Sequence, residues 1–224
     1  KTKKNFKNFS KITIKDIKNY LKKKKIYSLS KFMKPLVSII DYGMGNLFSI
    51  KCALDKVGLN SLITRNISII EKSEAIIIPG VGAFPNAIKS IKKYKLDKII
   101  KKHHFQNKII FGVCLGMQLL FQKSYEGTTS NGLGILKGDV RKFKVSKKNR
   151  QIFNVGWKKI KNQKKNIDSF ISKNDSYMYF IHSFYVKPKN TNIITSKSTF
   201  NGQQFVSSVK SGNVYGFQFH PEKS

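Results

Sequence analysis

Cysteine is scarce in this sequence, since Cys52 and Cys114 are the only two in 224 residues. Two cysteines form at most one disulfide, which excludes a small secreted fold held together by disulfides and favours a reducing compartment. The cysteine and histidine residues show no metal-ligand spacing, so no metal site is predicted. Cys52 lies in a helical stretch, where we expect it in the core, and His103 and His104 are expected at a solvated helix end.

Long apolar runs are also missing. No uninterrupted stretch approaches the roughly 20 residues that a membrane-spanning helix needs. The lysine-rich N-terminus has no apolar segment of the kind found in signal peptides. We therefore expect a cytoplasmic protein without a membrane partner, and the apolar fraction of 40% is in the range of globular domains with a full core.

Acidic residues are few, 11 against 44 basic ones, which gives a formal net charge of +33. Such a surface can attract nucleic acid through its phosphates. However, arginine, the usual reader of base edges and phosphates, occurs only at Arg65, Arg141 and Arg150, and the lysines are not massed around aromatic stacking platforms. The excess of Lys, Asn and Ile is typical of A+T-rich coding sequence. Nucleic-acid binding is therefore disfavoured as the main function, and a mild attraction for anionic substrates or an acidic partner remains.

The composition changes near residue 33. Residues 1–33 are rich in lysine and include the run 22–25, so we expect a disordered or non-native N-terminal extension. A short basic amphipathic helix that docks on a partner is the alternative. Residues 34–224 are expected to form one domain.

From Leu36 onward the pattern alternates between strand and helix, which predicts an α/β fold with a mostly parallel central sheet and flanking helices. After Gly127 the segments become short and β-type, so the C-terminal half should be β-rich, with turns at 201–202 and 211–213. Reactive groups should gather at the carboxyl ends of the parallel strands. The predicted elements are strand 36–40, helix 46–57, strand 61–63, strand 75–78, helix 85–94, helix 96–102, strand 109–112, helix 115–122 and β-type segments 177–186 and 204–209.

The spacing Gly112-x-Cys114-x-Gly116 lies between an apolar strand and a helical segment. It predicts a nucleophile elbow, in which flanking glycines leave room for one strained residue to project its side chain. A sulfur at a helix N-terminus is favoured as the thiolate. The alternative is that Cys114 is a small buried core residue.

His220 and Glu222 follow a β-type alternation at the end of the sequence. Residues two apart in an extended chain point to the same face, so Glu222 can accept the imidazole N–H of His220. Together with Cys114 they would supply nucleophile, base and orienting carboxylate. A surface turn is the alternative for the His-Pro-Glu segment.

The loop Pro79-Gly80-Val81-Gly82 follows a buried-looking strand. It lacks the Walker ending and a complete dinucleotide-binding pattern, so nucleotide binding is disfavoured. Exposure of backbone beside the nucleophile is the better interpretation, and a plain turn stays open.

At these residues the sequence resembles the class I (triad) glutamine amidotransferases, in particular the glutaminase subunits of imidazole glycerol phosphate synthase. The segments that carry the resemblance occur in the family's order and are IDYGMGNL at 40–47, PGVGAF at 79–84, GVCLGMQLLF at 112–121, GW at 156–157, IHSFYV at 181–186 and QFHPEKS at 218–224.

The resemblance implies roles for further residues. It places the oxyanion hole at the 80–82 loop together with one backbone amide, it assigns four residues to glutamine binding, and it places three at a partner interface. The implied oxyanion residues are Gly80, Val81, Gly82 and Leu115, the implied glutamine-binding residues are Gln118, Glu126, Ser183 and Phe184, and the implied interface residues are Asn46, Trp157 and Lys223. From the residues themselves, Gln118 could also be an ordinary helix residue and Glu126 a loop carboxylate.

The activity implied by the resemblance is hydrolysis of glutamine to glutamate and ammonia, without a cofactor. The ammonia would pass to a (β/α)8 cyclase (synthase) subunit, in a heterodimer that makes imidazole glycerol phosphate for histidine biosynthesis. The sequence departs from the family pattern in three places. Asn154 and Lys158 replace the flanking residues of the family's His-Met-Gly-Trp-Asn, and residues 1–33 have no counterpart in the family. The family also continues for a helix beyond position 224, which predicts a C-terminal truncation. The alternatives are a paralogous amidotransferase that serves a surface-polysaccharide sugar synthase, and an inactive basic interaction module.

Overall fold

The computed structural model describes residues 36–144, 152–163 and 176–224, so the predicted extension 1–33 lies outside the described residues. Its elements are, in chain order, β1 Leu36–Ile40, α2 Leu47–Lys56, β2 Asn60–Thr64, α3 Ile67–Lys72, β3 Ala75–Ile78, α4 Phe84–Lys93, α5 Leu96–Phe105, β4 Ile109–Val113, α6 Leu115–Leu119, β5 Phe121–Ser124, β6 Ser130–Asn131, β7 Leu136–Lys142, β8 Asn154–Lys159, β9 Lys161–Asn162, β10 Tyr177–His182, β11 Phe184–Pro188, η1 Thr191–Ile193, β12 Ile194–Phe200, β13 Gln203–Ser211, β14 Val214–Phe217 and η2 Pro221–Lys223.

The central sheet has eight strands in the order β2-β1-β3-β4-β14-β13-β12-β9. The strands from β2 to β14 run parallel to their neighbours, and β13, β12 and β9 continue the sheet in antiparallel pairs. A two-stranded sheet, β10-β8, and a four-stranded sheet, β11-β7-β5-β6, belong to the second half. The α/β fold with a β-rich C-terminal half is confirmed.

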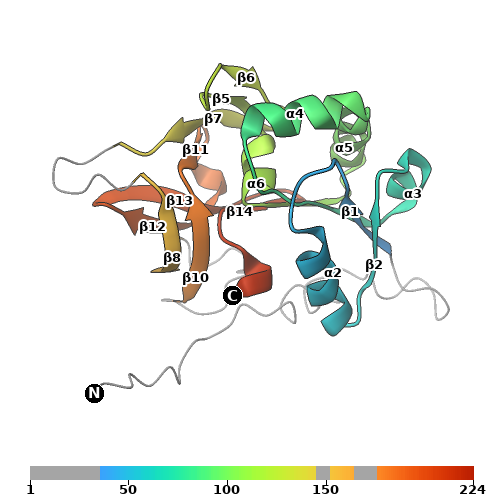
Figure 1. Cartoon of the computed structure of the whole chain (residues 1–224), viewed down its shortest axis with the longest axis horizontal. Helices are drawn as coiled ribbons and strands as arrows, with labels where there is room; N and C mark the ends of the chain where they lie inside the picture. Colours follow the sequence, from blue (N-terminus) through green and yellow to red (C-terminus); the bar gives the residue numbers. More distant parts are fainter. Residues whose placement is uncertain (1–35, 145–151, 164–175) are drawn as a thin grey trace.

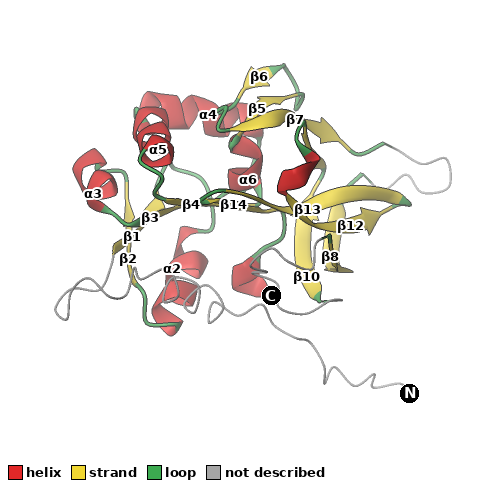
Figure 2. Cartoon of the chain, turned by 180° about the vertical axis from the view of Figure 1, so that it is seen from behind, coloured by secondary structure: helices red, strands yellow, loops and turns green. Residues whose placement is uncertain are grey.

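Helices cover both faces of the sheet. In Figure 1 the helices α4, α5 and α6 lie above the strands, while α2 and the C-terminal η2 lie below them, and Figure 2 shows the same layers from behind. Strand β3 explains why both layers are needed. Its residues Ile76 and Ile78 pack in one core cluster and Ala75 and Ile77 in the other, because successive side chains of a strand point to opposite faces. All four residues are buried, as expected for a central parallel strand.

Strands β1 and β3 have the predicted bounds, but two other predictions were wrong. The helix predicted over 115–122 ends at Leu119, because Phe121–Ser124 forms β5 and pairs with β7 and β6. The segment predicted as one β-type run over 177–186 is divided at Ser183 into β10 and β11, which pair with different strands.

Helix α3 was not predicted. It is only six residues long, and the side chain of Asn66 caps it by accepting hydrogen bonds from the backbone amides of Ser68 and Ile69. Such a short helix carries too few residues to establish a periodic apolar pattern.

The burial of two helix side chains, Cys52 and His103, is the opposite of what we expected. Cys52 is exposed, because Ile50 and Leu54 form the buried face of α2. His103 is fully buried on the same face of α5 as Ile99 and Ile100, whereas His104 is exposed as expected. The His103 Nε2 atom lies 2.7 Å from the carbonyl oxygen of Ile70, and burial lowers the pKa of the imidazole.

Within the described ranges, no helix is long and apolar enough to cross a membrane.

Candidate functional site

Cys114 lies in the predicted elbow. It directly follows β4 and has a φ of 52° and a ψ of −110°, which is a strained conformation for a residue with a Cβ atom. Its backbone amide donates to the carbonyl oxygen of Phe217 at 2.7 Å, and its own carbonyl oxygen accepts from the amides of Met117 and Gln118. The chain therefore turns from strand to helix within one residue, and the buried sulfur lies at the carboxyl end of the parallel strands.

Glycines around the elbow allow backbone to pack directly on backbone. A Cβ atom on Gly116 would lie 1.9 Å from the carbonyl oxygen of Ile78, and one on Gly112 would lie 2.7 Å from the carbonyl oxygen of Gly116. A Cβ atom on Gly80 would lie 2.3 Å from the amide nitrogen of Gly116 and 2.4 Å from the Cβ of Leu115. The loop at 80–82 and the start of α6 are thus in contact, as the prediction of a shared oxyanion hole requires.

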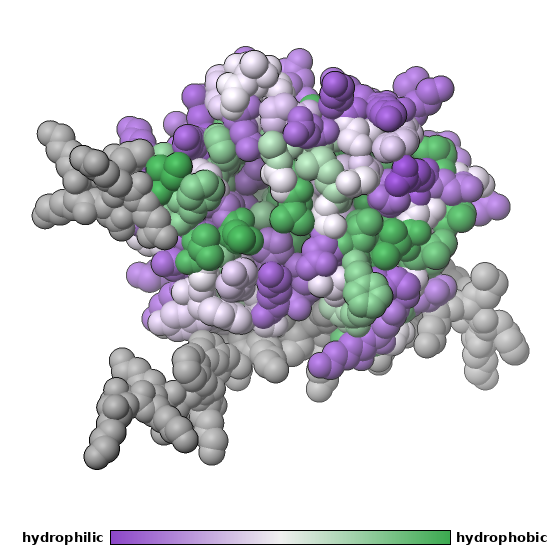
Figure 3. Space-filling view, in the orientation of Figure 1, coloured by the Kyte–Doolittle hydropathy of each residue, from purple (hydrophilic) through white to green (hydrophobic). Residues whose placement is uncertain are grey.

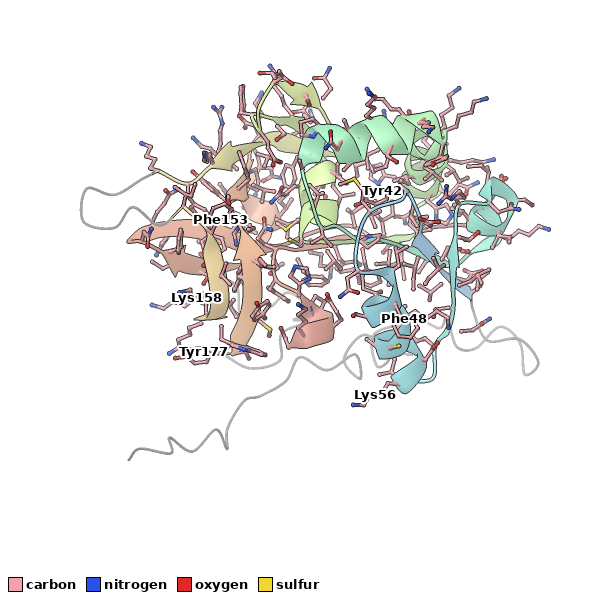
Figure 4. All side chains as sticks on the ribbon, viewed as in Figure 1. Tyr42, Phe48, Lys56, Phe153, Lys158 and Tyr177 are labelled. Atoms are coloured by element: carbon pink, nitrogen blue, oxygen red, sulfur yellow. The ribbon has the colours of Figure 1, made fainter. Side chains whose placement is uncertain are left out.

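Tyr42 binds the residue that precedes this loop, a contact that the sequence did not predict. Its hydroxyl group donates to the carbonyl oxygen of Pro79 at 2.5 Å, and burial together with the nearby Cys114 raises the pKa of the phenol. Figure 4 shows Tyr42 on the loop that follows β1, near the helices above the sheet. The available signal was the position of Tyr42 inside the segment IDYGMGNL.

His220 and Glu222 form an ion pair. The Nδ1 atom of His220 lies 2.8 Å from Oε1 of Glu222, and their side chains are only 5% and 3% exposed. The backbone geometry differs from the expectation. His220 caps the 3-10 helix η2 and Glu222 lies inside it, so a tight turn, and not the alternation of an extended strand, places the two side chains together.

The position of this turn is held by its backbone. The amide of His220 donates to the carbonyl oxygen of Tyr179 at 2.9 Å, and the hydroxyl of Ser224 donates to the carbonyl oxygen of His220 at 2.8 Å. Strand β14 pairs with β4 in parallel, with Phe217 opposite Val113. The residues that follow the two strands, His220 and Cys114, therefore lie at the same edge of the sheet.

The electrostatic surroundings favour a charged imidazole. Burial lowers the pKa of His220, but the interactions with Cys114 and Glu222 outweigh it and raise the pKa to about 10. Among the described residues, the buried His220 Nε2 atom has no hydrogen-bond partner. The ring is thus fixed by Glu222 through Nδ1, and Nε2 is left available for proton transfer.

Gln118 and Phe184 lie together beside the cysteine. The Nε2 atom of Gln118 donates to the carbonyl oxygen of Phe184 at 3.0 Å and to Oε1 of Gln218 at 3.1 Å. Gln218 is completely buried, and its Nε2 atom lies 3.8 Å from the Cys114 sulfur. Gln218 is a site residue that sequence reasoning missed, although it belongs to the QFHPEKS segment.

Glu126 and Ser183, the other expected glutamine-binding residues, make structural contacts. One carboxylate oxygen of Glu126 accepts from the backbone amide of Phe84 at 2.9 Å, at the start of α4, and burial raises the pKa of this carboxyl group. The Ser183 carbonyl oxygen accepts from the amide of Phe143. Glu126 is thereby connected to α4, which begins two residues after Gly82.

The three expected interface residues lie on different elements. Trp157 of β8 makes an edge-on contact with the ring of Tyr179, with ring centroids 5.9 Å apart, and the Lys223 ammonium lies 5.0 Å from the centre of the same ring. Trp157 and Lys223 thus meet at Tyr179. Asn46 instead caps α2, where its side chain accepts from the amide of Ser49 at 3.4 Å. In the described parts of the chain, no group of three or more His, Cys, Asp or Glu residues could hold a metal ion.

Comparison with known proteins agrees with this geometry. The sequence model described as "Glutamine amidotransferase class-I" matches residues 38–224. The chain belongs to the class I glutamine amidotransferase family.

Individual relatives give a more specific comparison than the family model does. The chain is 40% identical over 187 residues to "Imidazole glycerol phosphate synthase subunit HisH" of Aquifex aeolicus, with 83% of this chain and 88% of that protein covered. It is 41% identical to the protein of the same name from Bacillus cytotoxicus, with 84% and 88% covered.

Solved structures support the fold alone. A chain of "Structure of PurLQS from Thermotoga maritima" superimposes with a TM-score of 0.65 at 21% identity, with 85% of this chain and 89% of that chain covered. A second, "Crystal structure of glutamine amidotransferase", has a TM-score of 0.66 at 18% identity, with 84% and 91% covered.

Proposed function

We propose that this chain is the glutaminase subunit of imidazole glycerol phosphate synthase, which releases ammonia from glutamine for histidine biosynthesis in the cytoplasm. The amidotransferase unit comprises residues 34–224. The observation that carries the chemistry is the buried Cys114 on a strained elbow, at the same sheet edge as the His220–Glu222 ion pair. The identity to two subunits of that name, over more than four fifths of this chain, supports the pathway.

In the first half of the reaction the Cys114 thiolate attacks the side-chain carbonyl carbon of glutamine. A C–S bond forms, and the carbonyl electron pair moves onto oxygen. His220, protonated at Nε2, then donates its proton to the departing nitrogen as the C–N bond breaks. The products are ammonia and a γ-glutamyl thioester on Cys114.

In the second half the neutral His220 takes a proton from a water molecule, which attacks the thioester carbon. The C–S bond breaks, glutamate leaves, and the thiolate and the imidazolium are restored. Glu222 stabilises the imidazolium through its 2.8 Å contact with Nδ1 and fixes the ring orientation. Its function is to position His220, and it transfers no proton itself.

The oxyanion that forms in both halves needs backbone N–H donors. The amide of Leu115 and the loop of Gly80, Val81 and Gly82 supply them, and the close backbone contact between Gly80 and Gly116 supports this assignment. Each such donor is worth about 3 kcal/mol to the transition state.

Glutamine itself is bound by Gln118, Glu126, Ser183 and Phe184. The Nε2 atom of Gln118 is already engaged by Phe184 and Gln218, so its Oε1 atom is the group that can accept from the substrate. No cofactor takes part, because every step is a proton transfer or an acyl transfer that side chains and water can perform.

The ammonia acceptor is a (β/α)8 synthase subunit, bound as a heterodimer through the outer face of the β8–β10 sheet. Val155 and Trp157 pair with Ile181 and Tyr179, and all these side chains point to the same face because each pair lies two residues from the next. Val155, Trp157 and Ile181 are each more than 40% exposed. In Figure 3, apolar surface gathers over the side where β8 and β10 lie. Asn46 and Lys223 contribute polar contacts from α2 and η2.

Covalent labelling tests the proposal. A glutamine analogue with an electrophilic carbon in place of the amide should label Cys114 in the complex with the synthase subunit, as located by peptide mass spectrometry. Cys114→Ala should lose both labelling and glutamine hydrolysis, while Cys52→Ala, the change at the exposed thiol, should keep both. Hydrolysis that survives in Cys114→Ala would exclude the thioester mechanism.

A further inference from the structure

His220 and Tyr42 interact with the Cys114 sulfur through charge, and two further polar groups of opposite character contact it. The carbonyl oxygen of Ile181 lies 3.8 Å from it and can only accept a hydrogen bond. The side-chain nitrogen of Gln218 lies at the same distance and can only donate. The carbonyl favours the neutral thiol, and the amide favours the thiolate, because a hydrogen bond to the charged form stabilises that form.

The orientation of the Gln218 amide follows from its neighbours. The carbonyl oxygen of Phe184 lies 3.0 Å from the amide of Gln118, so Gln118 must turn its NH2 group toward it. The same NH2 group then faces the Gln218 amide at 3.1 Å, where only an oxygen can accept. Gln218 therefore points its own NH2 group at the sulfur. A flipped Gln218 amide would place two donors against each other.

The buried histidine His182 fixes the position of the Phe184 carbonyl group. His182 Nδ1 lies 2.7 Å from the same carbonyl oxygen of Phe184, and Nε2 lies 2.9 Å from the amide nitrogen of Asn154. Since a carbonyl cannot donate, the proton sits on Nδ1, and Nε2 accepts from Asn154. Both lone pairs of the Phe184 oxygen are thus used, and His182 holds in place the carbonyl that accepts from the Gln118 amide.

The backbone also holds Gln218 in place. Its amide donates to the carbonyl oxygen of Ser207 at 2.9 Å, and its side chain is completely buried, so water does not compete for the donor. We propose that Gln218 stabilises the Cys114 thiolate by donating a side-chain N–H to the sulfur, and that Gln118 and Phe184 impose the required amide orientation, with His182 holding the Phe184 carbonyl in place. This rests on the proposed role of Cys114 as nucleophile.

The test is the pH dependence of alkylation by iodoacetamide, which reports the thiolate without any need for glutamine turnover. It is measured on the full chain in a Cys52→Ser background, where Cys114 is the only thiol. Gln218→Glu keeps the oxygen for Gln118 but replaces the donor by a negative charge. We expect the pH at half-maximal alkylation rate to rise by about 1 to 2 units, since a like charge next to an ionising group acts on this scale. Gln218→Met removes the donor without adding charge and should shift the midpoint in the same direction by less.

Gln122→Glu is the matched control, because it makes the same exchange at an exposed glutamine of β5 whose oxygen accepts from the amide of Gly138. Its midpoint should equal that of the parent. An unchanged or lowered midpoint in Gln218→Met, with the variant folded by circular dichroism, would overturn the inference even if Gln218→Glu failed to fold. If instead Cys114→Ala still hydrolysed glutamine, the proposed function itself would fail, so the two failures are distinguishable.

Discussion

Glu222 offers the sharpest test of the proposed triad. Its carboxylate lies 2.8 Å from Nδ1 of His220, and both side chains are almost completely buried. Glu222→Gln preserves shape and leaves an oxygen that can still accept the imidazole N–H. The substitution therefore removes the negative charge while it retains the hydrogen bond and the ring orientation.

The magnitude follows from the loss of that charge. Two unit charges about 4 Å apart attract by about 4 kcal/mol at the effective dielectric constant near 20 that describes such sites. Part of this is recovered because the amide is less costly to bury than a carboxylate, so we expect a net loss of about 2 to 4 kcal/mol of imidazolium stabilisation. The value of kcat/KM should then fall roughly 30- to 1000-fold. The pKa of His220, now raised to about 10, should fall, because Glu222 is one of the groups that raise it.

The assay measures glutamine hydrolysis and thioester formation separately, across pH and in complex with the synthase subunit. Glu74→Gln is the control, because Glu74 is exposed and lies between α3 and β3. His220→Asn should be more damaging than Glu222→Gln, since both proton transfers pass through that ring. Steady-state hydrolysis by Glu222→Gln within threefold of the parent, with the same pH profile, would refute the argument and reduce the triad to a dyad.

Three further outcomes are expected. Gly116→Ala places a Cβ atom 1.9 Å from the Ile78 carbonyl oxygen. Chemical denaturation should therefore show a free energy of unfolding that is lower by about 3 kcal/mol. An unchanged free energy of unfolding would contradict the close packing at Gly116. Burial lowers the pKa of His182 to about 3 in the folded protein, below its ordinary 6.5. The unfolded state therefore binds more protons between these values, and stability should fall as pH drops below 6.5, by up to about 1.4 kcal/mol per pH unit. Denaturation of His182→Gln across pH should show a weaker dependence than the parent, and equal slopes would exclude a buried neutral histidine. Trp157→Ala should weaken binding of the synthase subunit about 30-fold, as measured by calorimetry. Phe105→Ala, a control at another exposed aromatic residue, should leave the affinity unchanged. If Trp157→Ala bound the synthase subunit as tightly as the parent, the interface would lie elsewhere.

Much of the fold could be predicted because the signals are local. Strands β1 and β3 are mostly apolar runs, each bounded by a proline on one side and an acidic residue on the other, and a parallel strand that is buried on both faces needs such a run. The elbow is local as well, since Gly112, Cys114 and Gly116 lie within five consecutive positions and their spacing alone indicates where backbone must pack closely.

Predictions failed where a distant partner decides the local structure. Helix α6 ends at Leu119 because β5 finds pairing partners in β7 and β6, and nothing within the segment 115–122 indicates those strands. His103 is buried because α3 supplies the Ile70 carbonyl oxygen for its ring, 33 residues away in the sequence. Apolar periodicity cannot indicate that a polar ring will find such a partner.

The sequence by itself determined which chemical groups are present: one thiol at a strand-to-helix elbow, and a histidine with a carboxylate two residues on. Only the tertiary structure decided that they share one sheet edge, because that depends on β14 pairing in parallel with β4 across more than 100 residues, with Phe217 opposite Val113. The tertiary structure also decided the surroundings of the sulfur, since Gln118 and Gln218 are 100 residues apart. Hydrogen bonds and charge interactions act over a few ångströms of space, and spacing along the chain predicts such contacts only when the groups are near neighbours in sequence.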